Sequence, residues 1–266
     1  MSNINYAIRV LKKTTGLLNF RKILEKLNGR IKLEKSFNSF YNQLELFKES
    51  MAKSNAPLKS NITKIIPLFN DETSETYFDG HYIYHPAWAA RILKSTDPEL
   101  HIDISSTLHF CSMLSAFIPV HFFDYRPANL LLSDLATGKI DLTAIDFETD
   151  SINSLSCMHT VEHIGLGRYG DPIDFEGDIK AMKELARVLA PKGNLLFVVP
   201  IGIPRIEFNA HRIYAYEQII NCFPTLKLKE FALIGDNFLK EGLLINPPIS
   251  ITNDQHWGCG CFWFTK

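Results

Sequence analysis

The sequence lacks any uninterrupted apolar run close to the about 20 residues that a membrane-spanning helix needs. Its opening residues, MSNINYAIRVLKK, contain neither the apolar stretch nor the small-residue cleavage site of a secretory signal peptide. These two absences predict a cytoplasmic protein with no transmembrane segment. With 266 residues, of which 46% are apolar and 21% charged, the chain is long enough for one substantial core and a smaller additional element.

The sequence also lacks the even set of cysteines that builds a disulfide framework. Its five cysteines lie mostly in apolar segments, as reduced and packed thiols do. The segment HWGCGC places His256 close to Cys259 and Cys261, but a structural zinc site takes four ligands. We therefore expect one of these two cysteines in the core and the other on the opposite strand face, and we predict no metal site.

Acidic residues are scarce in the first part of the chain. Residues 1–55 contain 11 Lys and Arg against 4 Asp and Glu, which leaves about −8 for the remainder of a chain whose net charge is −1. Apolar residues such as Ala7, Val10 and Leu11 recur at helical spacing between these charges, and the polar stretch SNAPLKSN follows. The pattern predicts a helical arm over residues 1–60 and a main domain over residues 61–266.

The role of this arm is open between packing and binding. Its apolar helix faces can pack on the main domain or form a homo-oligomer, and its positive charge can meet an anionic partner. Nucleic acid is not an expected partner, because the main domain is acidic and shows no basic and aromatic cluster of a recognised nucleic-acid-binding module.

The main domain alternates between helical and strand patterns, which predicts an α/β fold with a mostly parallel sheet. Pro86 suits the first turn of a helix that runs through PAWAARILKS, because a proline there lacks only an N–H that has no partner in the helix. The expected strands are LHIDI, IPVHFFD, a short one near KIDLTA, SLSCMH and NLLFVVP, with helices over about 106–116 and 175–189, the second stopped by Pro191 and Gly193.

Two segments of this domain resemble a known family. The run SLSCMHTVEHIG, followed by KELARVLAPKGNLLFVVP, is similar to the class I S-adenosylmethionine-dependent methyltransferases over about residues 80–266. The resemblance implies their Rossmann-like sheet with helices on both faces. The form HTVEHIGLGRYGDPIDFEGD, with FNAHRIYAYEQI downstream, looks like a little-characterised branch found among bacterial surface-polysaccharide gene products.

The resemblance implies a set of cofactor contacts. Asp103 and Asp124 match the acids that end the first two strands, and the second of these holds the ribose hydroxyls in the family. Asp141 matches the acid near the adenine amino group, and Phe147 stands where an aromatic ring packs on the adenine. Carboxylates accept paired hydrogen bonds from such groups, and strand ends of these sheets converge on the ligand crevice.

The sequence departs from the family pattern in the turn after the first strand. Ser105, Thr107 and His109 stand where the family prefers glycines, and a side chain in a left-handed backbone conformation costs about 1 to 2 kcal/mol. We therefore expect a different turn, in which the hydroxyls of Ser105 and Thr107 bind the methionine part of S-adenosyl-L-methionine. The missing glycines disfavour NAD, whose pyrophosphate needs bare backbone amides.

Two histidines follow the fourth predicted strand. His159 and His163 lie where this fold opens onto an acceptor, and histidine titrates in the range of a general base. We expect one of them to remove the proton of an acceptor hydroxyl. Of the two, we favour His159 as the base. The alternative is that His163 satisfies a buried backbone group while His159 is the exposed histidine.

The glycine-containing loop GLGRYGDPIDFEGD and the later segment FNAHR predict an acceptor-binding region. Arg168 and Arg212 can bind a phosphate or carboxylate of the substrate. Asp171 and His211, which lie in the same two segments, are further predicted substrate contacts. An ordinary acidic loop with a helix cap explains most of the same pattern. A divalent ion between the loop carboxylates and His211 is an alternative that the spacing does not require.

The sequence is consistent with two functions. The first is methyl transfer from S-adenosyl-L-methionine to an oxygen or nitrogen of a sugar, or of a nucleotide-linked precursor of a surface polysaccharide. The second is a non-catalytic protein of the same fold whose basic arm holds a partner enzyme.

Overall fold

The computed structural model describes residues 17–55, 60–69 and 71–266. By contacts within the chain it forms two units, residues 1–77 and 78–266, so the division lies later than the predicted boundary at residue 60. The helical spacing seen around Ala7 to Leu11 lies outside the described residues. Because the two units are not placed relative to each other, we describe each by itself.

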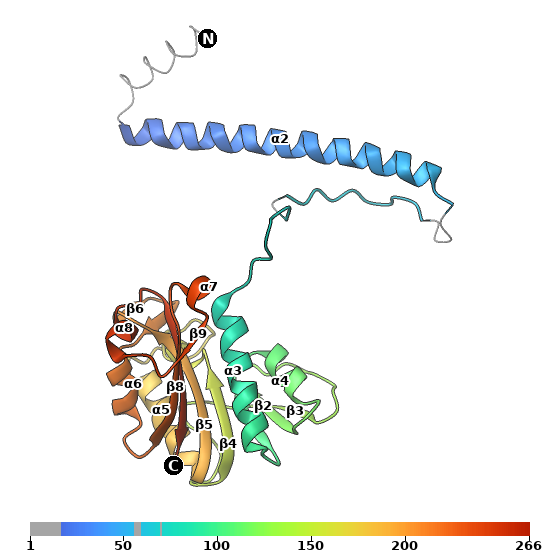
Figure 1. The fold of residues 1–266 in the computed structure, drawn as a ribbon. Helices are drawn as coiled ribbons and strands as arrows, with labels where there is room; N and C mark the ends of the chain where they lie inside the picture. The colour runs from blue at the N-terminus through green and yellow to red at the C-terminus, as the bar shows by residue number, and fades with distance from the viewer. Residues whose placement is uncertain (1–16, 56–59, 70) are drawn as a thin grey trace. The chain divides into compact units, whose positions relative to one another are not determined.

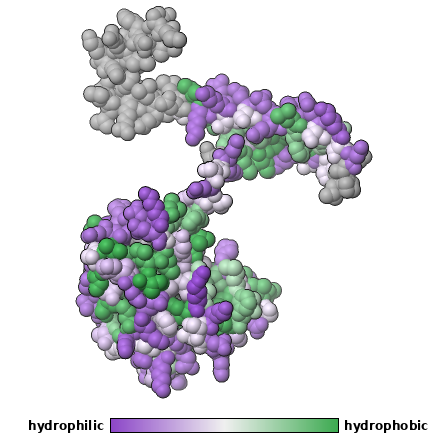
Figure 2. Space-filling model, in the orientation of Figure 1, coloured by the Kyte–Doolittle hydropathy of each residue, from purple (hydrophilic) through white to green (hydrophobic). Residues whose placement is uncertain are grey.

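The first unit contains one long helix, α2 (Leu17–Lys53). An extended segment follows it and packs back through Phe69, whose ring contacts Phe37 edge-on with 4.8 Å between the ring centroids. Figure 2 shows apolar residues among the charged ones along α2. Exposed apolar side chains of this helix are Ile31, Leu33, Tyr41, Leu46, Phe47 and Met51. No helix in the described part of the chain is both long and apolar enough to cross a bilayer.

The second unit is built on an eight-stranded sheet with the order β3-β2-β1-β4-β5-β10-β8-β9 (Figure 1). The five strands from β3 to β5 are parallel, and β10, β8 and β9 continue the sheet antiparallel. The strands are β1 (His101–Ile104), β2 (Val120–Asp124), β3 (Leu135–Lys139), β4 (Ile152–Met158), β5 (Leu189–Ile201), β8 (Lys227–Ile234), β9 (Leu243–Ile245) and β10 (Gly258–Thr265), beside a small hairpin of β6 (Arg205–Glu207) and β7 (His211–Ile213).

Helices cover both faces of this sheet, as expected for a Rossmann-like α/β fold. The helices are α3 (Gly80–Thr96), α4 (Leu108–Leu114), α5 (Gly177–Val188), α6 (Tyr216–Cys222), α7 (Phe238–Glu241) and α8 (Ile249–Asn253), with a 3₁₀ turn η1 (Val161–His163). The central strand β5 alternates between two cores: Phe197 packs with α5 and α6, and Val198 with α3 and α4. This period-two alternation explains why the sequence of β5 is apolar on both faces.

One helix begins earlier than the sequence predicts. Helix α3 begins at Gly80 rather than at Pro86, because the side chain of Asp79 caps it by accepting hydrogen bonds from the backbone N–H groups of His81 and Tyr82. Pro86 lies inside the helix. The earlier start brings His81 and Tyr82 into the first turn of α3.

Two further boundaries differ from the prediction. The third strand ends at Lys139, and the segment 140–144 that was expected to be a strand forms a turn instead. The helix α5 passes directly into β5 at Leu189, so Pro191 and Gly193 lie within the strand. A shift in register between β4 and β5 accommodates these two residues.

Candidate functional site

A first cavity opens where the parallel strands end. It has a volume of about 240 Å³, and its walls come from the segments that follow β1, β2, β3 and β4. We call it the strand-end cavity. Side chains and backbone that line it include Ser105, Asp124, Tyr125, Asp141, Thr143, His159, Thr160, His163, Tyr169 and Asp171. This edge of a parallel sheet is where open α/β folds bind their ligands.

Two carboxylates in the strand-end cavity each keep one oxygen free. Asp124 ends β2, and its Oδ1 accepts a hydrogen bond of 2.7 Å from the N–H of Arg126. Asp141 follows β3, and its Oδ1 accepts from the N–H and the hydroxyl of Thr143 at 2.9 and 2.7 Å. In both carboxylates the second oxygen, Oδ2, accepts no hydrogen bond from the described residues. These local bonds hold both side chains while leaving an acceptor for a ligand.

The turn after β1 corrects our expectation of a different backbone. Ser105 adopts the left-handed conformation, with φ 58°, although it is not a glycine. Its N–H donates to the carbonyl of Phe123 at 2.8 Å, and its own carbonyl accepts the hydroxyl of Thr160 at 2.9 Å. Bonds to both neighbouring segments thus fix a conformation that costs about 1 to 3 kcal/mol. The serine hydroxyl is thereby held at the cavity wall, as a glycine could not do.

A second cavity, of about 390 Å³, lies beside the start of α3. We call it the α3 cavity. Its walls include Asp79, His81, Tyr82, Thr107, Glu162, Arg168, His211 and Trp257. Four residues, Ser105, His159, His163 and Tyr169, line both cavities. The two spaces therefore adjoin along the ends of β1 and β4, with the histidines at their boundary.

His159 makes polar contacts through both of its ring nitrogens. Nδ1 lies 2.9 Å from Oε1 of Glu162, and Nε2 lies 3.4 Å from Sγ of Cys259 on β10. His159 also has a left-handed backbone, with φ 55°. Its side chain is 6% exposed against 12% for His163, so His159 is not the more exposed of the two histidines.

His163 presents one free nitrogen. Its Nδ1 lies 2.6 Å from the carbonyl of Ala210 and 3.3 Å from Nη1 of Arg168. The carbonyl is the closer partner, and because a carbonyl only accepts, it favours the neutral tautomer with the proton on Nδ1. The lone pair is then on Nε2, 3.8 Å from Oε1 of Glu162. Burial lowers the pKa of His163, partly opposed by the nearby Glu162 carboxylate. The neutral form, which can accept a proton, is favoured at pH 7.

Asp103 and Phe147 lie outside the lining of both cavities. Asp103 is fully buried, accepts hydrogen bonds from the hydroxyl of Ser156 and the N–H of Ser106, and has its pKa raised by burial. It therefore stabilises the turn that contains Ser105. Phe147 packs edge-on against Phe123, with 5.4 Å between the ring centroids.

The two predicted arginines have different surroundings. Arg168 is exposed at the α3 cavity and donates to the carbonyl of Ala210 at 3.0 Å. Arg212 is buried and donates to the carbonyls of Ile164 and Phe175, with Nε 3.4 Å from the Asp178 carboxylate. The structure thus corrects the expectation for Arg212: its guanidinium is taken up by the protein itself and reaches neither cavity.

The other two predicted substrate contacts line the cavities. Asp171 lies at the strand-end cavity, but one of its oxygens, Oδ2, accepts from the N–H of Gly165 at 2.7 Å, so it also shapes its own loop. His211 lies at the α3 cavity, with 4.3 Å between its ring centroid and that of Trp257. Thr107 also lies there and caps α4 through its hydroxyl oxygen.

Sequence reasoning missed the contribution of α3. His81 and Tyr82 line the α3 cavity, but a helix that starts at Pro86 leaves them in a linker. The signal was available in FDGHYIYHP, where Asp79 is a preferred N-cap residue. The expectation of opposite faces for Cys259 and Cys261 was also wrong, because residues two apart on a strand share a face, and both are buried with 3.9 Å between their sulfurs.

Comparison with known proteins gives distant similarities. A family model described as a Caenorhabditis protein of unknown function, DUF268, matches residues 132–225. No match was found among curated proteins. The chain is similar to the solved N-methyltransferase NodS from Bradyrhizobium japonicum in complex with S-adenosyl-L-homocysteine, at 13% identity and a TM-score of 0.47, covering 67% of this chain and 84% of that one.

Two further solved structures show a similar degree of likeness. One is a TehB-like SAM-dependent methyltransferase from Corynebacterium glutamicum, with 13% identity, a TM-score of 0.44 and coverage of 69% of this chain and 88% of that one. The other is a 1,6-didemethyltoxoflavin-N1-methyltransferase from Burkholderia thailandensis, with 10% identity, a TM-score of 0.45 and coverage of 68% and 79%.

Proposed function

We propose that this protein transfers a methyl group from S-adenosyl-L-methionine, with the nucleoside part of the cofactor in the strand-end cavity and the acceptor in the α3 cavity. The observation that carries the proposal is the pair of carboxylates, Asp124 and Asp141, which line one cavity and each keep an oxygen that accepts nothing from the described residues. A nucleoside offers matching donors, namely two vicinal hydroxyls and an exocyclic amine.

The polar groups of the cavity fit this cofactor better than a dinucleotide. In this proposal Asp124 accepts hydrogen bonds from the ribose hydroxyls and Asp141 accepts one from the adenine amine. The hydroxyls of Ser105 and Thr107 lie at the end of β1, where they can bind the amino and carboxylate groups of the methionine part. A pyrophosphate between two carboxylates would meet like charge instead of backbone amides.

The bound cofactor supplies an activated methyl group, so the protein contributes chiefly alignment and proton removal. The four residues shared by the two cavities mark where donor and acceptor meet. The sequence favours His159 as the base, but both nitrogens of His159 contact other side chains. We therefore favour His163, because its Nε2 carries the lone pair of a neutral ring. A base in this position contributes about 10² to 10⁴ in rate for a hydroxyl acceptor.

As the acceptor we propose the group predicted from the sequence, a hydroxyl or amine of a sugar or of a nucleotide-linked precursor of a surface polysaccharide. Support for this class comes from the walls of the α3 cavity. Trp257 and Tyr82 offer flat apolar surfaces for a sugar ring, and Arg168 offers a cation for a phosphate or carboxylate.

Thermal unfolding with S-adenosyl-L-homocysteine tests the proposal. A ligand that binds only the folded protein at 100 times its dissociation constant adds about 2.7 kcal/mol of stability. We expect a concentration-dependent rise in the melting temperature with this product and none with NAD⁺ at the same concentrations. A rise with NAD⁺ alone, or with neither compound, would refute the proposed cofactor.

A further inference from the structure

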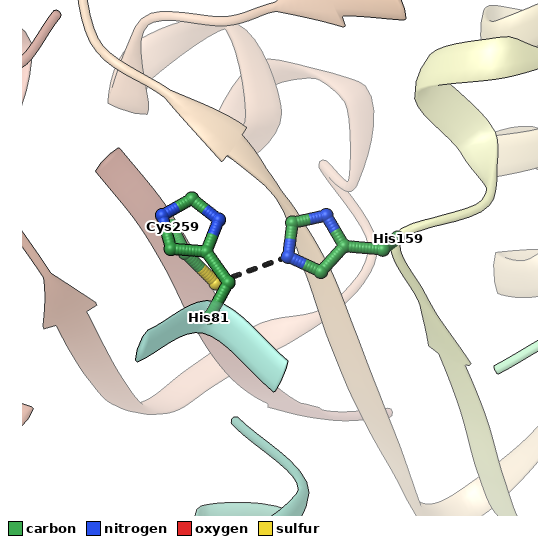
Figure 3. Close-up of side chains that lie close together, drawn as sticks. All are labelled: His81, His159 and Cys259. Carbon is green, nitrogen blue, oxygen red and sulfur yellow. Dashed lines mark hydrogen bonds between the residues drawn. The ribbon is translucent and has the colours of Figure 1, made fainter. Parts of the chain in front are cut away.

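Three potential metal ligands from distant parts of the chain meet beside the α3 cavity. His81 comes from the first turn of α3, His159 from the end of β4 and Cys259 from β10, as Figure 3 shows. One donor atom from each lies within 4.8 Å of the other two. A tetrahedral zinc ion with bonds of about 2.0 to 2.3 Å holds its ligand atoms about 3.3 to 3.8 Å apart. The pair of His159 Nε2 and Cys259 Sγ, at 3.4 Å, already has this spacing.

The contacts around the cluster favour one tautomer of each neutral histidine ring. The carboxylate of Glu162 accepts from Nδ1 of His159, which leaves the lone pair on Nε2, the nitrogen that faces Cys259. The carbonyl of Trp257 accepts from Nε2 of His81 at 3.1 Å, which leaves the lone pair of that ring on Nδ1. A carboxylate or carbonyl behind each ligating histidine is the usual second layer of a metal site in proteins.

A buried carboxylate oxygen next to the cluster lacks a hydrogen-bond partner among the described residues. The Glu162 side chain is 1% exposed, and its Oε2 has no hydrogen-bond partner among the described residues. Its ion-pair contacts in the described part of the chain are to His159 and His163. A buried carboxylate oxygen without a partner is costly, and a divalent ion bound by His159 would place a positive charge close to it.

The cluster is closed on one side and open on the other. Cys259 is fully buried and lines neither cavity, so its sulfur cannot reach a substrate and does not act as a nucleophile there. His81 and His159, in contrast, line the α3 cavity. An ion held by these three residues would have its fourth coordination position toward that cavity.

We propose that His81, His159 and Cys259 form a binding site for zinc or a similar borderline-soft divalent metal ion, with an open position facing the α3 cavity. Two imidazoles and a thiolate are a ligand set that zinc prefers, and three protein ligands with one free position are typical of zinc sites that bind a reactant. Binding deprotonates the Cys259 thiol, and that proton is released to solvent.

The open position gives the ion a role that rests on the proposed methyl transfer. An acceptor hydroxyl bound there becomes more acidic, because a bound zinc ion lowers the pKa of an oxygen ligand. His163, at the boundary of the same cavity, can then take the released proton. His159 serves as a ligand in this arrangement.

Metal binding is tested on the full-length protein without an affinity tag and without cofactor, so that a failure of S-adenosyl-L-homocysteine to bind leaves the test valid. We expect about one equivalent of zinc per chain by elemental mass spectrometry. After removal of zinc, Co²⁺ should give the intense visible bands of a tetrahedral site and the near-ultraviolet band of sulfur bound to cobalt.

Variants assign the ligands. Cys259→Ala should remove the sulfur band, and His81→Gln should weaken zinc binding at least tenfold. The conservative change Glu162→Gln, which keeps the first-layer ligands, should weaken it about 10- to 100-fold. His256→Gln is the matched control, because His256 is exposed and lies in the segment HWGCGC without belonging to the cluster.

Circular dichroism shows whether each variant is folded. The proposal would be overturned if the folded wild-type protein holds no zinc, gives no tetrahedral cobalt spectrum and shows no heat on titration with zinc. Equal loss of binding in His256→Gln and His81→Gln would overturn it as well, because the site would then lie elsewhere.

Discussion

Nδ1 of His159 lies 2.9 Å from Oε1 of Glu162, and the two side chains form a buried hydrogen-bonded pair at the end of β4. This pair fixes the tautomer of His159 and directs its other nitrogen to Cys259. His159 is therefore held within the protein, whereas the unprotonated nitrogen of His163 stays available at the boundary of the two cavities.

Replacing His163 should separate catalysis from cofactor binding. We expect His163→Asn to lower turnover at least tenfold with a hydroxyl acceptor, because the group that takes the proton is lost. The dissociation constant for S-adenosyl-L-homocysteine should change less than twofold. His109→Asn is the control, since His109 is exposed on α4 and lines neither cavity. Full activity of His163→Asn would remove His163 from the reaction and favour an amine acceptor.

The same histidine predicts a pH profile. Burial lowers the pKa of His163 from 6.5, so the folded protein keeps this ring neutral above that value. Single-turnover methyl transfer should therefore be constant between about pH 7 and 9 and fall only in acid, as the ring becomes protonated. A rate that still rises with pH above 7.5 would assign the base to another group.

The stability of the fold should depend on a buried histidine in the sheet. Nδ1 and Nε2 of His101 each lie 2.8 Å from a serine hydroxyl, of Ser154 and Ser156, and burial lowers the pKa of His101 to about 3. Below its ordinary pKa of 6.5 the unfolded chain binds a proton that the folded chain excludes. This histidine should thus reduce the free energy of unfolding by up to about 1.4 kcal/mol per pH unit as pH falls from 6.5.

Urea unfolding at several pH values measures this slope. His101→Asn should unfold more easily at neutral pH but show a shallower loss of stability between pH 6.5 and 4. An identical slope in the variant would show that His101 is not the group responsible.

The two arginines near the cavities should respond in opposite ways. Arg212→Leu leaves the buried Asp178 with the Tyr214 hydroxyl but no cation, and two backbone carbonyls without their donor. We therefore expect a loss of about 3 to 5 kcal/mol in the free energy of unfolding. Arg168→Leu should change stability little, because this side chain is exposed, and should raise the KM for an anionic acceptor. A stable Arg212→Leu protein with a raised KM would restore Arg212 as a substrate contact.

The exposed apolar residues of α2 predict association through the arm. Ile31, Leu46 and Phe47 of α2 are each at least half exposed. We expect full-length protein to have a multiple of the chain mass of 30.3 kDa by light scattering, and protein without residues 1–55 to be a monomer. Monomeric full-length protein would rule out a homo-oligomer.

The sequence predicted the layers of the fold because those depend on patterns that a single chain displays. The uninterrupted apolar run of β5 reflects burial on both faces, and the acids Asp124 and Asp141 mark strand ends whose position in a parallel sheet is general. The ends of helices were harder to predict than the layers. The N-cap at Asp79 sets the start of α3, although Pro86 is the more conspicuous residue.

The composition of the site could be predicted only in part, because its side chains meet through tertiary contacts. His81, His159 and Cys259 are separated by long stretches of sequence, and no spacing rule connects them. Arg212 looked like a substrate contact because arginine often binds anions, but its burial against Asp178 depends on the packing of η1 against α5 and β7. Ser105 keeps a left-handed backbone only because two neighbouring segments bind it.

Calorimetric titration with S-adenosyl-L-homocysteine tests the central claim most directly. Wild-type protein should bind one equivalent per chain, and Asp124→Asn should bind about 10- to 100-fold more weakly, because losing a charged acceptor for two hydroxyls costs about 1.5 to 3 kcal/mol. Asp146→Asn, a change at an exposed aspartate outside both cavities, should bind as the wild type does. Absence of binding by the folded wild type, or equal affinity in all three proteins, would contradict the placement of this cofactor at Asp124.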